Sequence, residues 1–126
     1  MKKNKEINIL VIDDDQMVHE LIRVMLKDSK YDILSSNNGT DGIKTFIKNK
    51  IDIVILDINM PGIDGRETLS RLKMIDNNVD VIMCTGDSDL RQKLYNDGAI
   101  AYITKPIYQD NLLNIIDMVL KLQKVV

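Results

Sequence analysis

The sequence is poor in the residues that mark several large classes of protein. It has a single cysteine, Cys84, so no disulfide can form within the chain, and this is typical of a reducing cytoplasm. It has no tryptophan, one phenylalanine and four tyrosines, which leaves few aromatic rings for stacking on nucleic-acid bases. The formal net charge of −2 provides no basic surplus for contacts with phosphate backbones. We therefore expect no direct nucleic-acid binding.

Long apolar segments are missing as well. A membrane-spanning helix needs about 20 consecutive apolar residues, and the apolar runs here are much shorter, so we expect no membrane association. The first ten residues, "MKKNKEINIL", contain lysines but no long apolar region or cleavage site, which argues against a secretory signal. We expect a cytoplasmic protein. With 126 residues, 44% of them hydrophobic, the sequence predicts a single domain over residues 1–126 with a substantial core.

Strand-like and helix-like segments alternate five times along the chain. Short apolar runs rich in β-branched residues predict strands at Ile7–Ile12, Tyr31–Leu34, Asp52–Leu56, Val79–Cys84 and Ala99–Thr104. Helical spacing of apolar residues predicts helices at Gln16–Lys27, Gly42–Lys48, Arg66–Ile75, Leu90–Asn96 and Asn111–Leu122. Each parallel crossover needs a covering helix, so the alternation predicts an α/β fold with helices on both faces of a parallel sheet. The second strand is the most polar and is expected at an edge.

Local signals predict several helix ends. Asp15 is expected to cap the first helix, and Asp64 followed by Glu67 resembles a capping box at the start of the third. Gly98 is expected to adopt a left-handed cap after the fourth helix.

The first helix is predicted to turn an apolar stripe toward the sheet. Its members are Met17, Leu21, Val24 and Met25, with Val18 or Ile22 beside them. The only histidine, His19, lies in this helix and is expected on the surface. Cys84 ends an apolar run and is expected to be buried.

Carboxylates, a threonine hydroxyl and an ammonium group follow four of the five predicted strands, whereas the second strand ends in Ser35-Ser36-Asn37, which carry no charge. The first strand leads into Asp13 and Asp14, the third into Asp57, the fourth into Thr85, and the fifth into Lys105. Sites in open parallel sheets form outside the carboxyl ends of the strands, so we expect these groups to share one rim. Each residue alone is commonly a cap, a turn residue or a solvated lysine. Their occurrence in order at successive strand ends points instead to a site.

The combination has a definite chemistry. Carboxylates held close together repel, and at least one pKa rises unless a cation lies among them. Magnesium prefers such oxygen ligands, often together with phosphate oxygens. Lys105 could hold an anion and Thr85 offers a hydroxyl donor. The pattern thus predicts a phosphate site with a carboxylate nucleophile.

The sequence resembles the receiver domain of bacterial two-component response regulators from about Asn8 to Leu122. The order and spacing of the matching pieces are more specific than any single piece. They are "ILVIDDD" at 9–15, "DIVILDINMPGIDG" at 52–65, "VIMCTGD" at 81–87 and "GAIAYITKP" at 98–106. The resemblance implies a flavodoxin-like, doubly wound (βα)5 fold with a five-stranded parallel sheet in the order 2-1-3-4-5.

The resemblance also implies a metal site and a phosphoacceptor. Asp57 would accept the phosphoryl group. Mg2+ would be held by Asp13, Asp14 and Asp57 and by the backbone carbonyl of Asn59.

Further roles follow from the same resemblance. Thr85 and Lys105 would bind phosphoryl oxygens, and Tyr102 would be the switch aromatic that moves with Thr85. The Lys105–Pro106 peptide bond would be cis.

As a receiver, the protein would be a signalling module rather than a turnover enzyme. A sensor histidine kinase or a histidine phosphotransfer protein would donate the phosphoryl group. Phosphorylation would then alter the face around the fourth helix, the fifth strand and the fifth helix for an unidentified downstream protein or output domain. Three positions depart from the usual family pattern, namely Gly86, Ile107 and Asn111, which affects the details of this output face.

Two other classes remain open from the residues. A magnesium-dependent phosphatase or phosphotransferase of the haloacid-dehalogenase kind would also use an Asp nucleophile, but it has a second Asp two residues later, where this chain has Asn59. An unphosphorylated interaction scaffold is the other, although all the key acids are present. The chain is expected to act as a stand-alone receiver or as the receiver of a longer regulator or hybrid kinase.

Overall fold

The structure, a computed structural model, describes residues 7–86 and 98–124. Its elements in chain order are β1 (Ile7–Ile12), α1 (Gln16–Leu26), β2 (Tyr31–Ser36), α2 (Gly39–Lys48), β3 (Ile53–Asp57), α3 (Gly65–Ile75), β4 (Val81–Thr85), β5 (Ala101–Thr104) and α5 (Gln109–Gln123). The predicted helix Leu90–Asn96 lies outside the described residues. No helix within the described ranges has the length and apolar character needed to cross a bilayer.

The five strands form one parallel sheet in the order β2-β1-β3-β4-β5. The fold class and the strand order expected from the sequence are therefore confirmed, and the polar strand β2 is an edge as predicted. The register pairs Ile12 with Leu56, Asp57 with Cys84, and Thr85 with Thr104. This alignment brings the carboxyl ends of β1, β3, β4 and β5 to the same rim.

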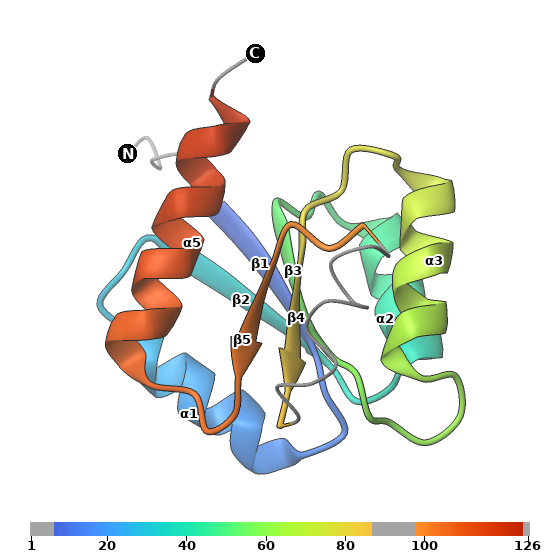
Figure 1. The fold of residues 1–126 in the computed structure, drawn as a ribbon, viewed down its shortest axis with the longest axis horizontal. Helices are drawn as coiled ribbons and strands as arrows, with labels where there is room; N and C mark the ends of the chain where they lie inside the picture. The colour runs from blue at the N-terminus through green and yellow to red at the C-terminus, as the bar shows by residue number, and fades with distance from the viewer. Residues whose placement is uncertain (1–6, 87–97, 125–126) are drawn as a thin grey trace.

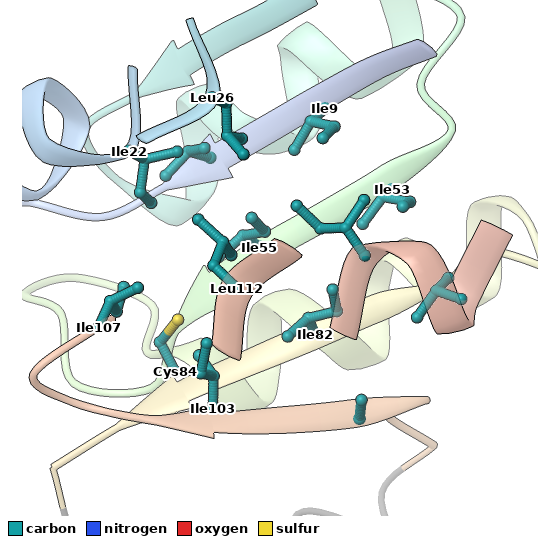
Figure 2. Close-up of a cluster of buried hydrophobic side chains, with 14 residues drawn as sticks. Ile9, Ile22, Leu26, Ile53, Ile55, Ile82, Cys84, Ile103, Ile107 and Leu112 are labelled. Atoms are coloured by element: carbon teal, nitrogen blue, oxygen red, sulfur yellow. The ribbon is translucent and has the colours of Figure 1, made fainter. Parts of the chain in front are cut away.

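Helices cover both faces of the sheet, with α1 and α5 on one side and α2 and α3 on the other (Figure 1). Successive strand side chains point to opposite faces. In β1, Ile9 and Val11 therefore join one buried cluster while Leu10 and Ile12 join another. The first cluster, under α1 and α5, includes Ile22, Leu26, Ile55, Cys84, Leu112 and Ile116 (Figure 2). The second cluster, under α2 and α3, includes Phe46, Leu56, Leu69, Leu72 and Met83.

The predicted apolar stripe of the first helix is largely wrong. Met17, Leu21 and Val24 are 75%, 41% and 63% exposed. The face of α1 that is buried instead carries His19, Ile22 and Leu26. Because α1 has apolar residues on two faces, their spacing alone could not decide which face packs on the sheet.

The predicted N-caps of α1 and α3 are confirmed, whereas α2 begins at Gly39 and α5 at Gln109, three and two residues before the predicted starts. The Asp15 side chain caps α1 by accepting a hydrogen bond from the backbone N–H of Met17. The Asp64 side chain caps α3 by accepting from the N–H of Glu67 at 2.9 Å. Gly98 has a positive φ of 99°, as expected for a left-handed position.

Candidate functional site

The candidate site lies at the rim formed by the carboxyl ends of the strands. Asp57 is the last residue of β3 and Thr85 the last residue of β4, while Asp13 and Lys105 directly follow β1 and β5. The side chains of Asp13, Asp57 and Thr85 are buried. The Lys105 Nζ atom lies 3.0 Å from Asp13 Oδ2 and 3.3 Å from Asp57 Oδ1. The sequence therefore predicted correctly that groups far apart in the chain meet at this edge.

Three carboxylates gather closely enough to share a metal ion. One oxygen from each of Asp13, Asp14 and Asp57 lies within 4.8 Å of the others. Asp13 and Asp57 are buried, whereas Asp14 is exposed, so the cluster is open to solvent on one side. Carboxylate oxygens are the ligands that a hard divalent cation such as Mg2+ prefers, and the donor set fits that ion.

The charges at this site are unbalanced in a way that a cation would relieve. Burial raises the pKa of Asp57, and the neighbouring charge of Asp13 raises it further, while Lys105 partly opposes both effects. Burial lowers the pKa of Lys105, but its hydrogen bond with Asp13 and the charges of Asp57 and Asp13 outweigh that effect and raise it. The ammonium group therefore stays charged and neutralises part of the acidic cluster.

Hydrogen bonds with the backbone hold Asp13 more firmly than Asp57. The N–H of Asp13 donates to the carbonyl of Ser36 in β2, and Asp13 Oδ1 accepts from the N–H of Asp15 at 2.9 Å. On the other strand, Asp57 Oδ1 lies 3.4 Å from the N–H of Asn59, which is a weak contact. The side chain of Asn59 is exposed beside the cluster. These contacts leave the Asp57 carboxylate facing the rim.

The opposite wall of the site comes from β4 and β5. The backbone N–H of Lys105 donates to the carbonyl of Thr85 at 2.8 Å, which links the two strand ends. The Lys105–Pro106 peptide bond, for which the resemblance implied a cis geometry, is cis in the structure. Tyr102 is partly buried and packs against the second cluster. At Gly86, an added Cβ would meet no atom within 4 Å, so packing does not require glycine there.

The expectation for His19 is wrong, because this side chain is buried with only 1% of its surface exposed. Its Nε2 atom lies 2.7 Å from the backbone carbonyl oxygen of Asp13, and its Nδ1 atom has no hydrogen-bond partner within residues 7–86 and 98–124. The spacing of His19 from Ile22 and Leu26, at i+3 and i+7, placed all three on one helix face and could have revealed this position. His19 is thus the residue beside the site that sequence reasoning missed.

Comparison with known proteins identifies the family. The family profile described as "Response regulator receiver domain" matches residues 9–117. The chain belongs to the receiver-domain family of two-component response regulators. Receivers of this family are phosphorylation-activated signalling domains.

Curated relatives of this receiver span most of its length. Sporulation initiation phosphotransferase F of Bacillus subtilis is 33% identical over 106 residues, which cover 82% of this chain and 86% of that protein. Chemotaxis protein CheY of Listeria monocytogenes is 31% identical over 118 residues, which cover 91% of this chain and 99% of that protein.

Solved structures share the receiver fold. A response regulator receiver domain protein from Clostridium thermocellum aligns with a TM-score of 0.88 at 31% identity, covering 94% of this chain and 98% of that one. The response regulator TrrA from Thermotoga maritima, crystallised in complex with Mg(2+)-BeF, aligns with a TM-score of 0.83 at 32% identity, covering 90% and 98%.

Proposed function

We propose that this receiver accepts a phosphoryl group on Asp57 in a Mg2+-dependent reaction, and that its donor is a phosphohistidine on a sensor histidine kinase or a histidine phosphotransfer protein. The observation that carries the proposal is the position of the Asp57 carboxylate. It is buried at the rim of the sheet, lies beside two further acids and contacts the only lysine described at this edge, Lys105. A carboxylate in this setting is a suitable nucleophile for an electron-poor phosphorus atom.

The chain's own oxygen atoms would hold the metal ion. The carboxylates of Asp13, Asp14 and Asp57 would be ligands, and we assign a further one to the backbone carbonyl of Asn59. Bound Mg2+ would offset the negative charge of the acids and of the phosphoryl oxygens.

The transfer step uses the side chains at the rim. One carboxylate oxygen of Asp57 forms a bond to phosphorus while the bond from phosphorus to the donor's imidazole nitrogen breaks, and the nitrogen keeps the electron pair. The Lys105 ammonium pairs with a phosphoryl oxygen, and the Thr85 hydroxyl donates a hydrogen bond to another. The product is a mixed anhydride that water later hydrolyses.

Phosphorylation would switch the receiver through charge. The new group adds about −1.5 to −2 charges next to Lys105 and Thr85 and draws both toward it. Tyr102 would then change position with Thr85, which alters the surface around β5 and α5 that a downstream protein or output domain recognises. Coupling of this kind is typically about 1–3 kcal/mol, which is enough to change partner affinity.

We further propose that residues 1–126 act as one signalling unit in the cytoplasm, with no turnover of an external substrate. The free, buried thiol of Cys84 is compatible with a reducing compartment. Asn59 supplies an amide rather than the acid that the haloacid-dehalogenase alternative requires. The preserved acidic cluster gives no support to an unphosphorylated scaffold.

The proposal is tested by incubating the protein with acetyl phosphate and Mg2+ and separating the products on a phosphate-affinity gel. We expect wild type to be retarded and Asp57→Asn to run as unmodified protein. Asp64→Asn is the matched control, because Asn caps a helix as well as Asp does and α3 should be undisturbed. Tyr102→Ala should also be retarded, since its role is in the response. Equal modification of wild type and Asp57→Asn would overturn the assignment.

A further inference from the structure

His19 sits directly behind the acidic cluster although it contributes nothing to the cluster's surface. It comes from the buried face of α1, and its side chain reaches back to the β1–α1 turn. Its Nε2 atom is 2.7 Å from the backbone oxygen of Asp13. A carbonyl oxygen only accepts hydrogen bonds, so Nε2 is the donor in this contact, and Nδ1 is left as the second polar atom of the ring.

The Nδ1 atom is buried and has no hydrogen-bond partner among the described residues. A buried polar atom without a hydrogen-bond partner reduces stability, and an apolar side chain of similar size would avoid this cost. Packing alone therefore does not account for a histidine at position 19. The contact that distinguishes His19 from an apolar residue is the hydrogen bond from Nε2 to the carbonyl oxygen of Asp13.

This hydrogen bond holds the peptide unit that joins Asp13 to Asp14, so it affects the backbone of two acidic residues. The carbonyl of Asp13 belongs to the planar unit that continues into the N–H and Cα of Asp14. On its other side, Asp13 is held by the bond from its N–H to Ser36. With His19 on the carbonyl, neither peptide flanking Asp13 can rotate freely, and this limits where the carboxylates of Asp13 and Asp14 can lie.

We propose that His19 is a positioning residue for the metal site, which keeps the carboxylates of Asp13 and Asp14 in the arrangement that binds Mg2+. The inference rests on the proposed Mg2+ site, and it adds a specific supporting residue to that site. Groups that orient ligands in this indirect way typically contribute about tenfold or more to metal affinity.

Three substitutions of His19, which differ in side-chain length and in whether they supply an N–H donor, test the proposal. His19→Gln places an amide N–H near the position of Nε2, whereas the shorter His19→Asn does not reach it, and His19→Leu has no donor. Mg2+ affinity is measured by titration with MgCl2 followed by backbone amide shifts in 15N NMR, and stability by urea unfolding without metal. We expect His19→Leu and His19→Asn to bind Mg2+ about tenfold more weakly, and His19→Gln to stay close to wild type.

A matched control separates positioning from general loss of packing. Ile22→Val shortens a fully buried side chain on the same face of α1 and removes no hydrogen bond to Asp13. It should lower stability and leave the Mg2+ affinity unchanged. The inference is overturned if His19→Leu binds Mg2+ as wild type does, if His19→Gln binds as weakly as His19→Leu, or if affinity simply follows stability across all variants.

The same titration distinguishes this inference from the proposed function. Asp14→Asn is included as the variant that lacks a proposed ligand. Failure of wild type itself to bind Mg2+ would overturn both proposals. Binding by wild type, loss in Asp14→Asn and unchanged binding in His19→Leu would overturn only the role of His19.

Discussion

At the scale of single residues, Asp57 shows how the site opposes the stability of the fold. Its carboxylate is buried, its pKa is raised chiefly by that burial and next by the charge of Asp13, and Lys105 offsets only part of this. A group with a raised carboxyl pKa in the folded state binds its proton more tightly there than in the unfolded chain. As the pH rises through the interval between the two pKa values, the unfolded chain loses the proton first, so stability falls with pH.

The first prediction concerns the loss of stability that the buried Asp57 carboxylate causes. In the absence of divalent cations at pH 7, Asp57→Asn should raise the free energy of unfolding by roughly 0.5–2 kcal/mol, the usual range for one stabilising replacement. The advantage should shrink as the pH falls toward the ordinary carboxyl pKa of about 4, where wild-type Asp57 becomes protonated in both states. Urea unfolding at several pH values measures the difference in free energy of unfolding between Asp57→Asn and wild type, with Asp64→Asn as control. A less stable Asp57→Asn at pH 7 would contradict the argument.

At the scale of elements, α1 has two apolar faces, of which one is buried and the other is exposed. The face with Ile22 and Leu26 packs into the first cluster. The opposite face leaves Met17, Leu21 and Val24 exposed around a shallow depression that Val18 and Glu20 complete. Because α1 begins next to the acidic cluster, the proposed phosphotransfer protein would contact this exposed face when it brings its phosphohistidine to Asp57.

The second prediction tests that contact. Leu21→Glu should slow phosphotransfer from a phosphorylated histidine phosphotransfer protein about tenfold, equivalent to about 1.4 kcal/mol, because a charge replaces an apolar contact. Phosphorylation by acetyl phosphate should be unchanged, since the rim is intact. Met74→Glu, an exposed apolar position on α3, is the control and should behave as wild type. Slower reaction of Leu21→Glu with both donors would point to damage at the site instead.

At the scale of the whole molecule, the sheet connects the site to the core. The acids follow or end β1 and β3, whose residues lie in both buried clusters. Lys105 joins this pair to β5, and its contact with Asp13 bridges 92 positions of the sequence. Unfolding would separate these proposed ligands, so a metal ion bound among them should favour the folded state.

The third prediction states the size of this linkage. Mg2+ at ten times its dissociation constant should raise the free energy of unfolding by about 1.4 kcal/mol. Asp14→Asn should lose most of the gain, because it removes an exposed ligand without disturbing the core. Asp28→Asn, exposed beyond the other end of α1, should keep it. Denaturation with and without MgCl2 gives the comparison, and an equal gain in Asp14→Asn would count against the proposed ligand set.

Much of the fold and of the site was predictable because the relevant rules are local. The β-rich runs predicted the strands, and the polarity of β2 indicated an edge. Parallel strands end at one rim, so the sequence alone was enough to place Asp13, Asp57, Thr85 and Lys105 together. The strand order 2-1-3-4-5, in contrast, came from the family resemblance, because strand alternation alone allows several orders.

The environment of α1 was not predictable in the same way. Its sequence has apolar residues around most of its circumference, and the solitary His19 resembled a surface residue. Only the packing of α1 against β1 and α5 decided that His19, Ile22 and Leu26 face inward while Leu21 and Val24 face out.

The sequence by itself determined which elements form and which chemical groups the strand ends present, because both depend on residue periodicity and on the geometry of parallel strands. The tertiary structure decided which face of α1 is buried, that His19 reaches the carbonyl of Asp13, and that one ammonium group contacts two acids. Those outcomes depend on how packed elements are rotated against one another, and the free energy of that packing is shared among residues far apart in the chain.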